Sequence, residues 1–216
     1  MAVRRKPRDE ARRARHDVYR QHIFEAAERV FADRGFEAAR LQEISKLAGL
    51  SMGTIYAVFP GKNELHRAIL EERGGELLEL VREVAAREAS PRDALDALIE
   101  LYVGWFVAHP GFLRMHLRAG TSWALTPPGT AAQVRHWEDI HALQAGIFRR
   151  GVAAGVFVDE DPAYLARLFS AMDQVLLAEW VAGGMKAERT ELVSRLRRQA
   201  ERSFCRTAVR RAMRSA

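Results

Sequence analysis

One short stretch of the sequence, GLSMGTIYAVFPGK (residues 49–62), combines residue types that suit contact with a polyanion. Thr54 and Tyr56 carry hydroxyl groups that can donate hydrogen bonds to phosphate oxygens, and Lys62 carries an ammonium group. Gly53 would let a helix backbone approach another molecule closely, although glycine costs a helix interior about 1 kcal/mol. Packing within one chain does not explain this set of residues, so the stretch indicates a DNA-contacting surface.

Two short helices joined by a turn would position these groups. We expect the first helix over residues 41–48 and the second over residues 52–59, with Gly49 in the turn and Ser51 as the cap of the second helix. This arrangement is typical of a helix-turn-helix, whose second helix presents its N-terminal residues to the DNA major groove. The side chains expected to form the core beneath it are Ile23, Phe31, Ile44, Leu47, Ile55 and Phe59.

Helical periodicity continues through the rest of the chain, and strand signals are absent. We predict an all-α protein of about nine helices, with a basic N-terminal arm (1–16), a helix-turn-helix unit of three short helices (17–66) and a larger helical domain (67–216). Helices are expected over residues 17–34, 41–48, 52–59, 91–109, 112–118, 131–154, 163–182 and 188–214, and a long one from Lys62 onward.

Charge is distributed unevenly along the chain. Residues 1–16 hold seven Lys and Arg against two acidic residues, and residues 189–216 hold nine Arg against two Glu. The total net charge is +6, so the segment between these basic ends is acidic. Basic ends are consistent with a polyanion such as DNA, because neutralising phosphates drives binding. For the C-terminal end, we favour the alternative of a solvated charged surface.

Several functional classes are not indicated by the sequence. Cys205 is the single cysteine, which excludes an internal disulfide and a cysteine-based metal cluster. The N-terminus lacks the apolar core of a secretory signal, and no apolar run is long enough to span a membrane, so we expect a cytoplasmic location. Phosphate loops and the common hydrolase motifs are also absent. We therefore expect neither an enzyme nor a bound cofactor or metal.

The segment AGLSMGTIYAVFPGKNEL resembles the signature of the tetracycline-repressor (TetR) family of bacterial transcription regulators, and AAERVFADRGFEA upstream resembles the first helix of that family. The motif resemblance covers roughly residues 20 to 66. The matching residues are Ile44, Ala48, Gly49, Leu50, Ser51, Gly53, Thr54, Tyr56, Phe59, Lys62 and Leu65, with Phe31, Gly35 and Phe36 upstream.

Departures from the family pattern affect the expected contacts with DNA. Arg40 stands where a threonine or serine usually caps the second helix, and Met52 replaces a polar residue at the start of the third. Met52 could contact a thymine methyl group instead. For the arm, we weigh contact with phosphates or the minor groove equally against a disordered tail. The residues expected to contact DNA are Gln42, Ser51, Met52, Gly53, Thr54, Tyr56, Lys62 and Arg15.

The resemblance implies that residues 67–216 form a ligand-binding and dimerisation domain, with a homodimer made through the last two helices. Pairing two DNA-binding units on a palindromic operator would double the contacts. The wide apolar faces of the last two helices favour such an interface, although an internal core explains them as well. The residues predicted to form the dimer interface are Leu165, Leu168, Phe169, Met172, Leu176, Trp180, Leu192, Leu196 and Phe204.

Bulky residues concentrate in the middle of the chain, where they suit an apolar pocket with a few polar groups. The predicted pocket residues are Trp105, Phe106, His109, Phe112, Met115, Trp123, Trp137, His141 and Phe148, with His116 and Gln144 as further polar candidates. We therefore expect a repressor that a small, largely apolar effector releases from double-stranded DNA. The alternative is a constitutive or architectural DNA-binding protein without an effector.

Overall fold

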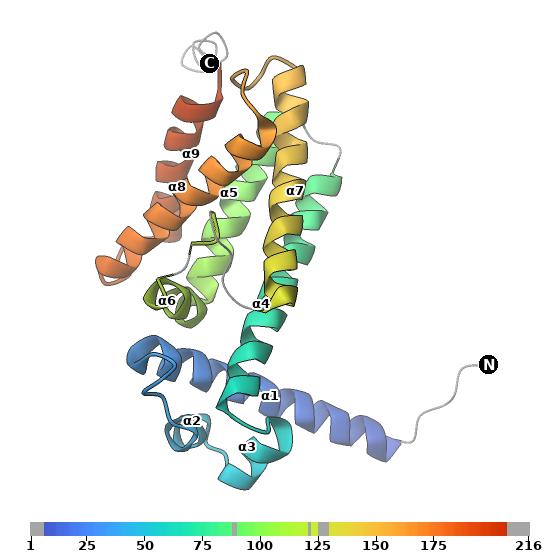
Figure 1. The fold of residues 1–216 in the computed structure, drawn as a ribbon, viewed down its shortest axis with the longest axis vertical. Helices are drawn as coiled ribbons and strands as arrows, with labels where there is room; N and C mark the ends of the chain where they lie inside the picture. The colour runs from blue at the N-terminus through green and yellow to red at the C-terminus, as the bar shows by residue number, and fades with distance from the viewer. Residues whose placement is uncertain (1–6, 88–89, 121, 125–129, 207–216) are drawn as a thin grey trace, which may run out of the picture.

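The computed structural model describes residues 7–87, 90–120, 122–124 and 130–206, with side chains placed from residue 14 onward. Over these residues it contains nine helices and one isolated β-bridge, between Phe157 and Cys205 (Figure 1). No helix in these ranges is long and apolar enough to cross a membrane. The predicted all-α class is confirmed.

The helices follow the predicted order along the chain. They are α1 (Pro7–Arg34), α2 (Leu41–Ala48), α3 (Met52–Val58), α4 (Lys62–Ala86), α5 (Pro91–Ala108), α6 (Pro110–Arg118), α7 (Ala131–Ala153), α8 (Pro162–Ala182) and α9 (Arg189–Phe204).

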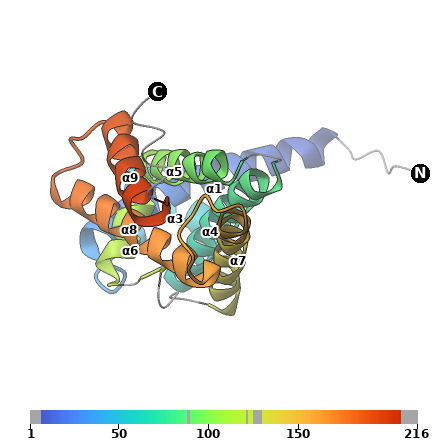
Figure 2. The same cartoon turned by 90° about the horizontal axis from the view of Figure 1, so that it is seen from above.

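The helices form two regions that share one long element. Helices α1 to α3 and the first turns of α4 make a small unit at the lower end of Figure 1, and the remaining helices form the body above it. Helix α4 runs without interruption from one region into the other. Figure 2 shows, from above, that the N-terminal part of α1 extends beyond the body. The boundary predicted near residue 66 therefore falls inside a continuous helix.

Capping side chains explain why several helices begin where the sequence predicts. The Ser90 hydroxyl accepts a hydrogen bond from the Asp93 amide before Pro91 opens α5. The Asp161 carboxylate accepts bonds from the amides of Ala163 and Tyr164 at the start of α8. Each cap satisfies amide groups that the first turn of a helix leaves without a partner.

Two helix boundaries differ from the prediction. Helix α1 begins at Pro7, ten residues before the predicted start, and proline at a first helical position fits because its missing amide hydrogen is not needed there. Helix α9 ends at Phe204, where the backbone turns to pair with residues 156–158: the Val158 amide donates to the Phe204 carbonyl, at 2.8 Å. The predicted continuation beyond residue 206 lies outside the described residues.

Candidate DNA-binding and effector sites

The turn between α2 and α3 has the geometry of a helix-turn-helix. Gly49 adopts a left-handed conformation with φ of 67°, which ends α2 without the steric penalty that a Cβ would bring. The Leu50 amide then donates to the Ser45 carbonyl at 3.1 Å, and the Ser45 hydroxyl donates to the Leu50 carbonyl at 2.6 Å. These two bonds fix the position of α3 relative to α2.

The start of α3 is organised by its own hydroxyl groups. The Ser51 hydroxyl accepts the Thr54 amide at 3.1 Å and lies 2.9 Å from the Thr54 hydroxyl. A Cβ at Gly53 would meet only the Ser51 hydroxyl, at an ordinary 3.7 Å, so packing within the chain does not require glycine there. Tyr56, one turn after Met52, is 53% exposed. An open helix face with a bare backbone position suits close approach to DNA.

The opposite face of α3 is fully packed. Ile55 and Phe59 are buried, and the Phe59 ring stacks on Phe24 of α1 with centroids 5.6 Å apart. These residues are in the core as predicted, together with Ile23, Phe31 and Ile44.

Leu47 is the exception to the predicted core. It is 50% exposed and borders a shallow groove with His22, Ala26 and Ala48. The prediction was wrong because α2 is only two turns long. Its inner face is filled by Ile44 and Ser45, which leaves Leu47 at the edge.

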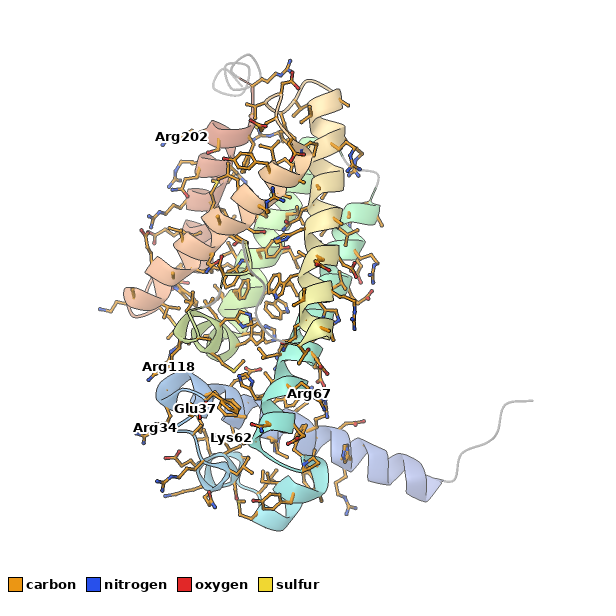
Figure 3. The ribbon with its side chains drawn as sticks, viewed as in Figure 1. Arg34, Glu37, Lys62, Arg67, Arg118 and Arg202 are labelled. Atoms are coloured by element: carbon orange, nitrogen blue, oxygen red, sulfur yellow. The ribbon has the colours of Figure 1, made fainter. Side chains whose placement is uncertain are left out.

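Lys62 has a different position from the one expected. Its ammonium group donates to the carbonyl oxygens of Phe36 at 2.7 Å, Glu37 at 3.0 Å and Ala39 at 3.2 Å, and lies over the Phe36 ring (Figure 3). An ammonium group has three hydrogens, so these carbonyls use its full donor capacity. The side chain therefore ties α4 to the turn between α1 and α2.

The other predicted contact residues are accessible to different degrees. Gln42 is exposed near the start of α2, and Met52 is half-buried at the start of α3. Arg15 is exposed in the N-terminal part of α1. Arg40, for which no DNA contact was predicted, is exposed and immediately precedes α2.

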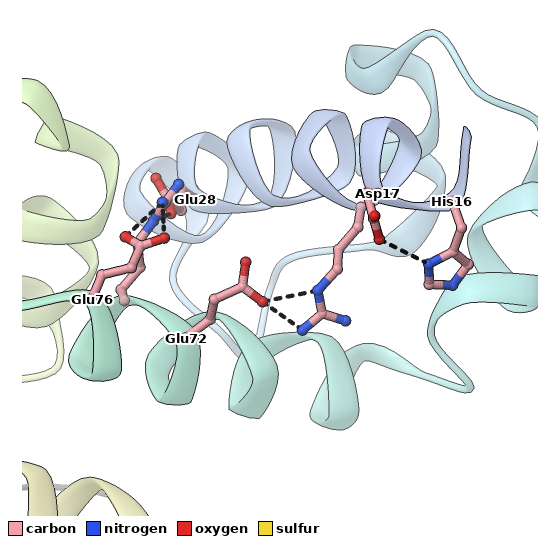
Figure 4. A network of polar contacts seen from close by, with 7 residues as sticks. His16, Asp17, Glu28, Glu72 and Glu76 are labelled. Carbon is pink, nitrogen blue, oxygen red and sulfur yellow. Dashed lines mark hydrogen bonds and ion pairs between the residues drawn. The ribbon is translucent and has the colours of Figure 1, made fainter. Parts of the chain in front are cut away.

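A buried ion-pair network joins the small unit to the body. The Arg73 guanidinium of α4 donates to Glu28 of α1 at 2.8 Å and to Glu76 at 3.0 Å (Figure 4). Burial lowers the pKa of Arg73, but the hydrogen bonds and charges of both carboxylates outweigh it and raise the pKa. Arg20 pairs with Glu72 further along the same two helices. Helices α1 and α4 are thereby held in one orientation.

Helix α6 makes a second connection between the two regions. On one side, Arg114 pairs with Asp33 of α1 at 2.6 Å, and Gly111 lies so close to Glu28 that a Cβ would approach it to 3.0 Å. On the other side, Phe112 and His116 point into the body and are buried. A displacement inside the body at α6 would therefore be transmitted to α1.

An aromatic cluster occupies the body above α6. The Trp123 indole lies between Phe106 and Trp137, with ring centroids 5.1 Å and 5.9 Å away and ring planes within 17° of parallel. Phe112 and His116 complete the lower side. Burial, and secondarily the nearby His66, lowers the pKa of His116 to about 4, so this imidazole is neutral at pH 7.

The structure gathers only part of the predicted pocket. Trp105, Phe106, Phe112, Met115, Trp123 and Trp137 are buried, and the five aromatic residues among them belong to this cluster.

The other predicted pocket residues lie elsewhere. Phe148 packs with Phe157 and Phe204 at the far end of the body. His109 lies half-exposed against the Trp105 ring, and His141 is half-buried on α7. Sequence periodicity could not separate these three residues from those of the aromatic cluster. Aromatic side chains recur at similar spacing along several parts of the body.

Most of the predicted dimer interface lies in the core of the same chain. Leu168 and Met172 are partly exposed, and next to them Val175 is 60% exposed. The prediction was wrong for the rest because α5 and α7 cover the apolar faces of α8 and α9. The predicted interface residues buried within the chain are Leu165, Phe169, Leu176, Trp180, Leu192, Leu196 and Phe204.

Comparison with known proteins identifies relatives of the small unit. The family model described as bacterial regulatory proteins, tetR family, matches residues 23–69. The HTH-type transcriptional activator FasR of Mycolicibacterium smegmatis is 32% identical over 119 residues, which cover 55% of this chain and 53% of FasR. The chain spans about half the length of the curated relatives it matches.

Solved structures share the fold over most of the chain. A transcriptional regulator from Saccharomonospora viridis in complex with choline gives a TM-score of 0.67 at 24% identity, covering 87% of this chain and 97% of that chain. The transcriptional regulator FadR from Bacillus subtilis in complex with stearoyl-CoA gives 0.63 at 18% identity, covering 82% and 95%. At this identity the likeness shows a common all-α architecture.

Proposed function

We propose that this chain, a member of the TetR family of bacterial regulatory proteins, is a homodimeric transcriptional repressor that binds a palindromic operator and is released by a small, largely apolar effector. The observation that carries the proposal is the exposed face of α3, with the bare backbone at Gly53 next to the exposed Tyr56 ring. We assign direct DNA contact to Gln42, Ser51, Met52, Gly53, Thr54 and Tyr56.

Two further residues have indirect or secondary roles in this proposal. Lys62 acts by fixing the α1–α2 turn rather than by contacting phosphate, because its donors are already used. Arg15 on α1 and Arg40 before α2, both exposed, supply charge for the DNA backbone.

The dimer uses the exposed apolar strip of α8, where Leu168, Ala171, Met172 and Val175 form a groove with Gln199 and Arg202 of α9. Apolar side chains exposed together on one helix face favour burial against a second copy. A symmetric pair would present two α3 helices to successive major grooves, roughly 34 Å apart.

Release by an effector follows from the position of α6. A molecule entering the aromatic cluster would shift Phe112 and His116, and α6 would move against Asp33 and Glu28 of α1. The separation of the two α3 helices would then no longer match the operator. Such a shift requires the effector to bind the displaced state more tightly than the DNA-bound state.

Relatives and structural neighbours differ in the direction of regulation and in the ligand they hold. FasR is named an activator, and the two structural neighbours hold chemically different ligands, choline and stearoyl-CoA. The buried aromatic cluster supports an effector with an apolar body.

Selection of bound sequences from a random DNA library tests the proposal directly. We expect an enriched inverted repeat, and binding to it that falls by about tenfold or more in Tyr56→Ala, since one good contact to a base is worth about 1 to 3 kcal/mol. Tyr164→Ala is the matched control, because Tyr164 is similarly exposed but lies on α8.

Two outcomes would contradict the proposal. Enrichment of no sequence, with affinity falling steeply with salt, would favour a constitutive or architectural DNA-binding protein. Equal loss of DNA affinity in both tyrosine variants would mean that α3 is not the helix that recognises the DNA sequence.

A further inference from the structure

A buried carboxylate at the centre of the body has no role in the fold described so far. Asp173 of α8 is fully buried, and its Oδ1 accepts the Trp123 indole N–H at 3.0 Å. Its Oδ2 has no hydrogen-bond partner among the described residues, and no ion pair found there includes Asp173. A buried polar atom without a partner destabilises a fold, and nearly all such atoms in native proteins have one, so Oδ2 of Asp173 calls for an explanation.

The surroundings of this carboxylate are aromatic. Trp123 contacts it directly and is itself stacked between Phe106 of α5 and Trp137 of α7. The faces of tryptophan and phenylalanine rings carry negative electrostatic potential and attract cations. Trp123 meets the carboxylate with its N–H edge and its ring is stacked with Phe106 and Trp137, so a cation would gain both the carboxylate and a ring face once this stack opens.

Neighbouring polar groups do not supply the missing positive charge. The Tyr102 hydroxyl, Ser170 and Gln144 form their own chain, with Gln144 donating to Tyr102 at 2.7 Å and Ser170 donating to Gln144 at 3.2 Å. His116 of α6, in contact with the Trp123 ring, is neutral at pH 7 because burial lowers its pKa to about 4. None of these described neighbours supplies a positive charge for an ionised Asp173.

We propose that Asp173, with Trp123, Trp137 and Phe106, is the recognition site for the effector and takes an organic cation, an amine or quaternary ammonium group carrying an apolar body. The inference rests on the proposed function, because it names the class of effector for that regulator. The positive group pairs with Oδ2 of Asp173, and the apolar body replaces part of the Trp123 stack. Trp123 is the ring in this cluster that comes from a connector rather than a helix.

The protonation of Asp173 supports this assignment. Burial raises the pKa of Asp173 well above its usual range, although the hydrogen bond from Trp123 and the nearby Gln174 backbone amide act in the opposite direction. The same burial raises the pKa of Tyr102, and the nearby Asp173 adds to that effect. A cation lowers the free energy of the ionised carboxylate, so its binding would be accompanied by release of a proton from Asp173.

Three probes with one apolar body and different charges test the proposal: 4-phenylbutylamine, 4-phenylbutanol and 4-phenylbutyrate. Binding to the full chain is measured by calorimetry and tryptophan fluorescence at pH 7. We expect the amine to bind about tenfold or more tightly than the alcohol, and the carboxylate to bind weakest. Equal affinity for amine and alcohol, tightest binding of the carboxylate, or binding of none of the three would overturn the proposal.

A nearly isosteric variant separates charge from shape. Asp173→Asn should remove the preference for the amine over the alcohol while the alcohol still binds, and Asp139→Asn, on the exposed face of α7, should keep the preference. Retention of the preference in Asp173→Asn would place the cation elsewhere. The wild-type comparison of the probes stands even if Asp173→Asn fails to fold.

The DNA selection described above distinguishes failure of this inference from failure of the proposed function. Sequence-specific DNA binding without any preference for the amine would reject the cation site alone. A preference for the amine in a protein that selects no DNA sequence would reject the regulator and leave Asp173 as a binding site for an organic cation.

Discussion

The small N-terminal unit and the body use similar helices but bury them differently. In the small unit, the predicted DNA contacts Gln42, Gly53 and Tyr56 are exposed, and Ile55 and Phe59 behind them are buried. In the body, seven of the nine residues predicted to face a second copy are buried within the same chain. In the small unit, α1, α2 and α3 pack on one another, whereas in the body α4 packs on α7 and α5 packs on α9, across several intervening helices. In the small unit, the apolar pattern therefore identifies the buried face of a helix. In the body, the same pattern does not identify which helix covers that face.

The largest effect is expected where the two regions meet. Arg73→Ala would leave the Glu28 carboxylate buried without its guanidinium partner, which should lower the free energy of unfolding by about 3 to 5 kcal/mol. Chemical denaturation measures this loss of unfolding free energy. Arg82→Ala, an exposed pair within α4, is the control and should cost less than about 1 kcal/mol. Similar losses in both variants would mean that the buried pair between α1 and α4 stabilises the protein no more than an exposed pair does.

The second largest effect tests which residues of α8 and α9 belong to the core and which to the proposed dimer interface. Leu196→Ala, at a fully buried position, should lower the free energy of unfolding by about 2 to 5 kcal/mol. Val175→Asp, on the exposed strip of α8, should leave the fold intact and prevent formation of the proposed dimer, as measured by sedimentation. If Val175→Asp remained dimeric, the interface would have to lie on another face.

A smaller effect is expected from Lys62. Lys62→Ala would remove the donor to three carbonyl oxygens and should cost about 1 to 3 kcal/mol of stability, measured by thermal unfolding. The salt dependence of DNA affinity should stay the same, because no phosphate contact is lost. A shallower salt dependence in the variant would instead support the phosphate contact that the sequence predicted for Lys62. Lys46→Ala, an exposed lysine on α2, is the matched control.

The smallest effect is expected at Leu47, the residue of the small unit that was wrongly predicted to lie in the core. Leu47→Ala should change the free energy of unfolding by about 0.5 kcal/mol or less, because the side chain is half-exposed. Ile44→Ala, on the inner face of the same helix, should cost about 2 to 5 kcal/mol. Comparable losses would show that Leu47 is covered in solution.

Much of the fold and part of the site were predictable from local pattern. The class, the helix-turn-helix and the starts of α5 and α8 follow from spacing, capping residues and glycine positions. The N-terminal extension of α1 was missed, because its basic residues carry no apolar stripe that would mark a helix. The role of Lys62 was also missed, since its partners lie 23 to 26 residues away along the chain.

The sequence by itself determined the helices and the polar face of α3, because capping, glycine conformation and helical periodicity act over a few residues. Tertiary structure alone decided which apolar faces meet inside the chain, and it brought Asp173 of α8 against Trp123 from the connector between α6 and α7, 50 residues earlier. Contacts between distant segments depend on how helices pack, and similar apolar stripes pack in many ways. The sequence therefore predicted Phe106, Trp123 and Trp137 of the proposed effector site, and only the folded arrangement added Asp173.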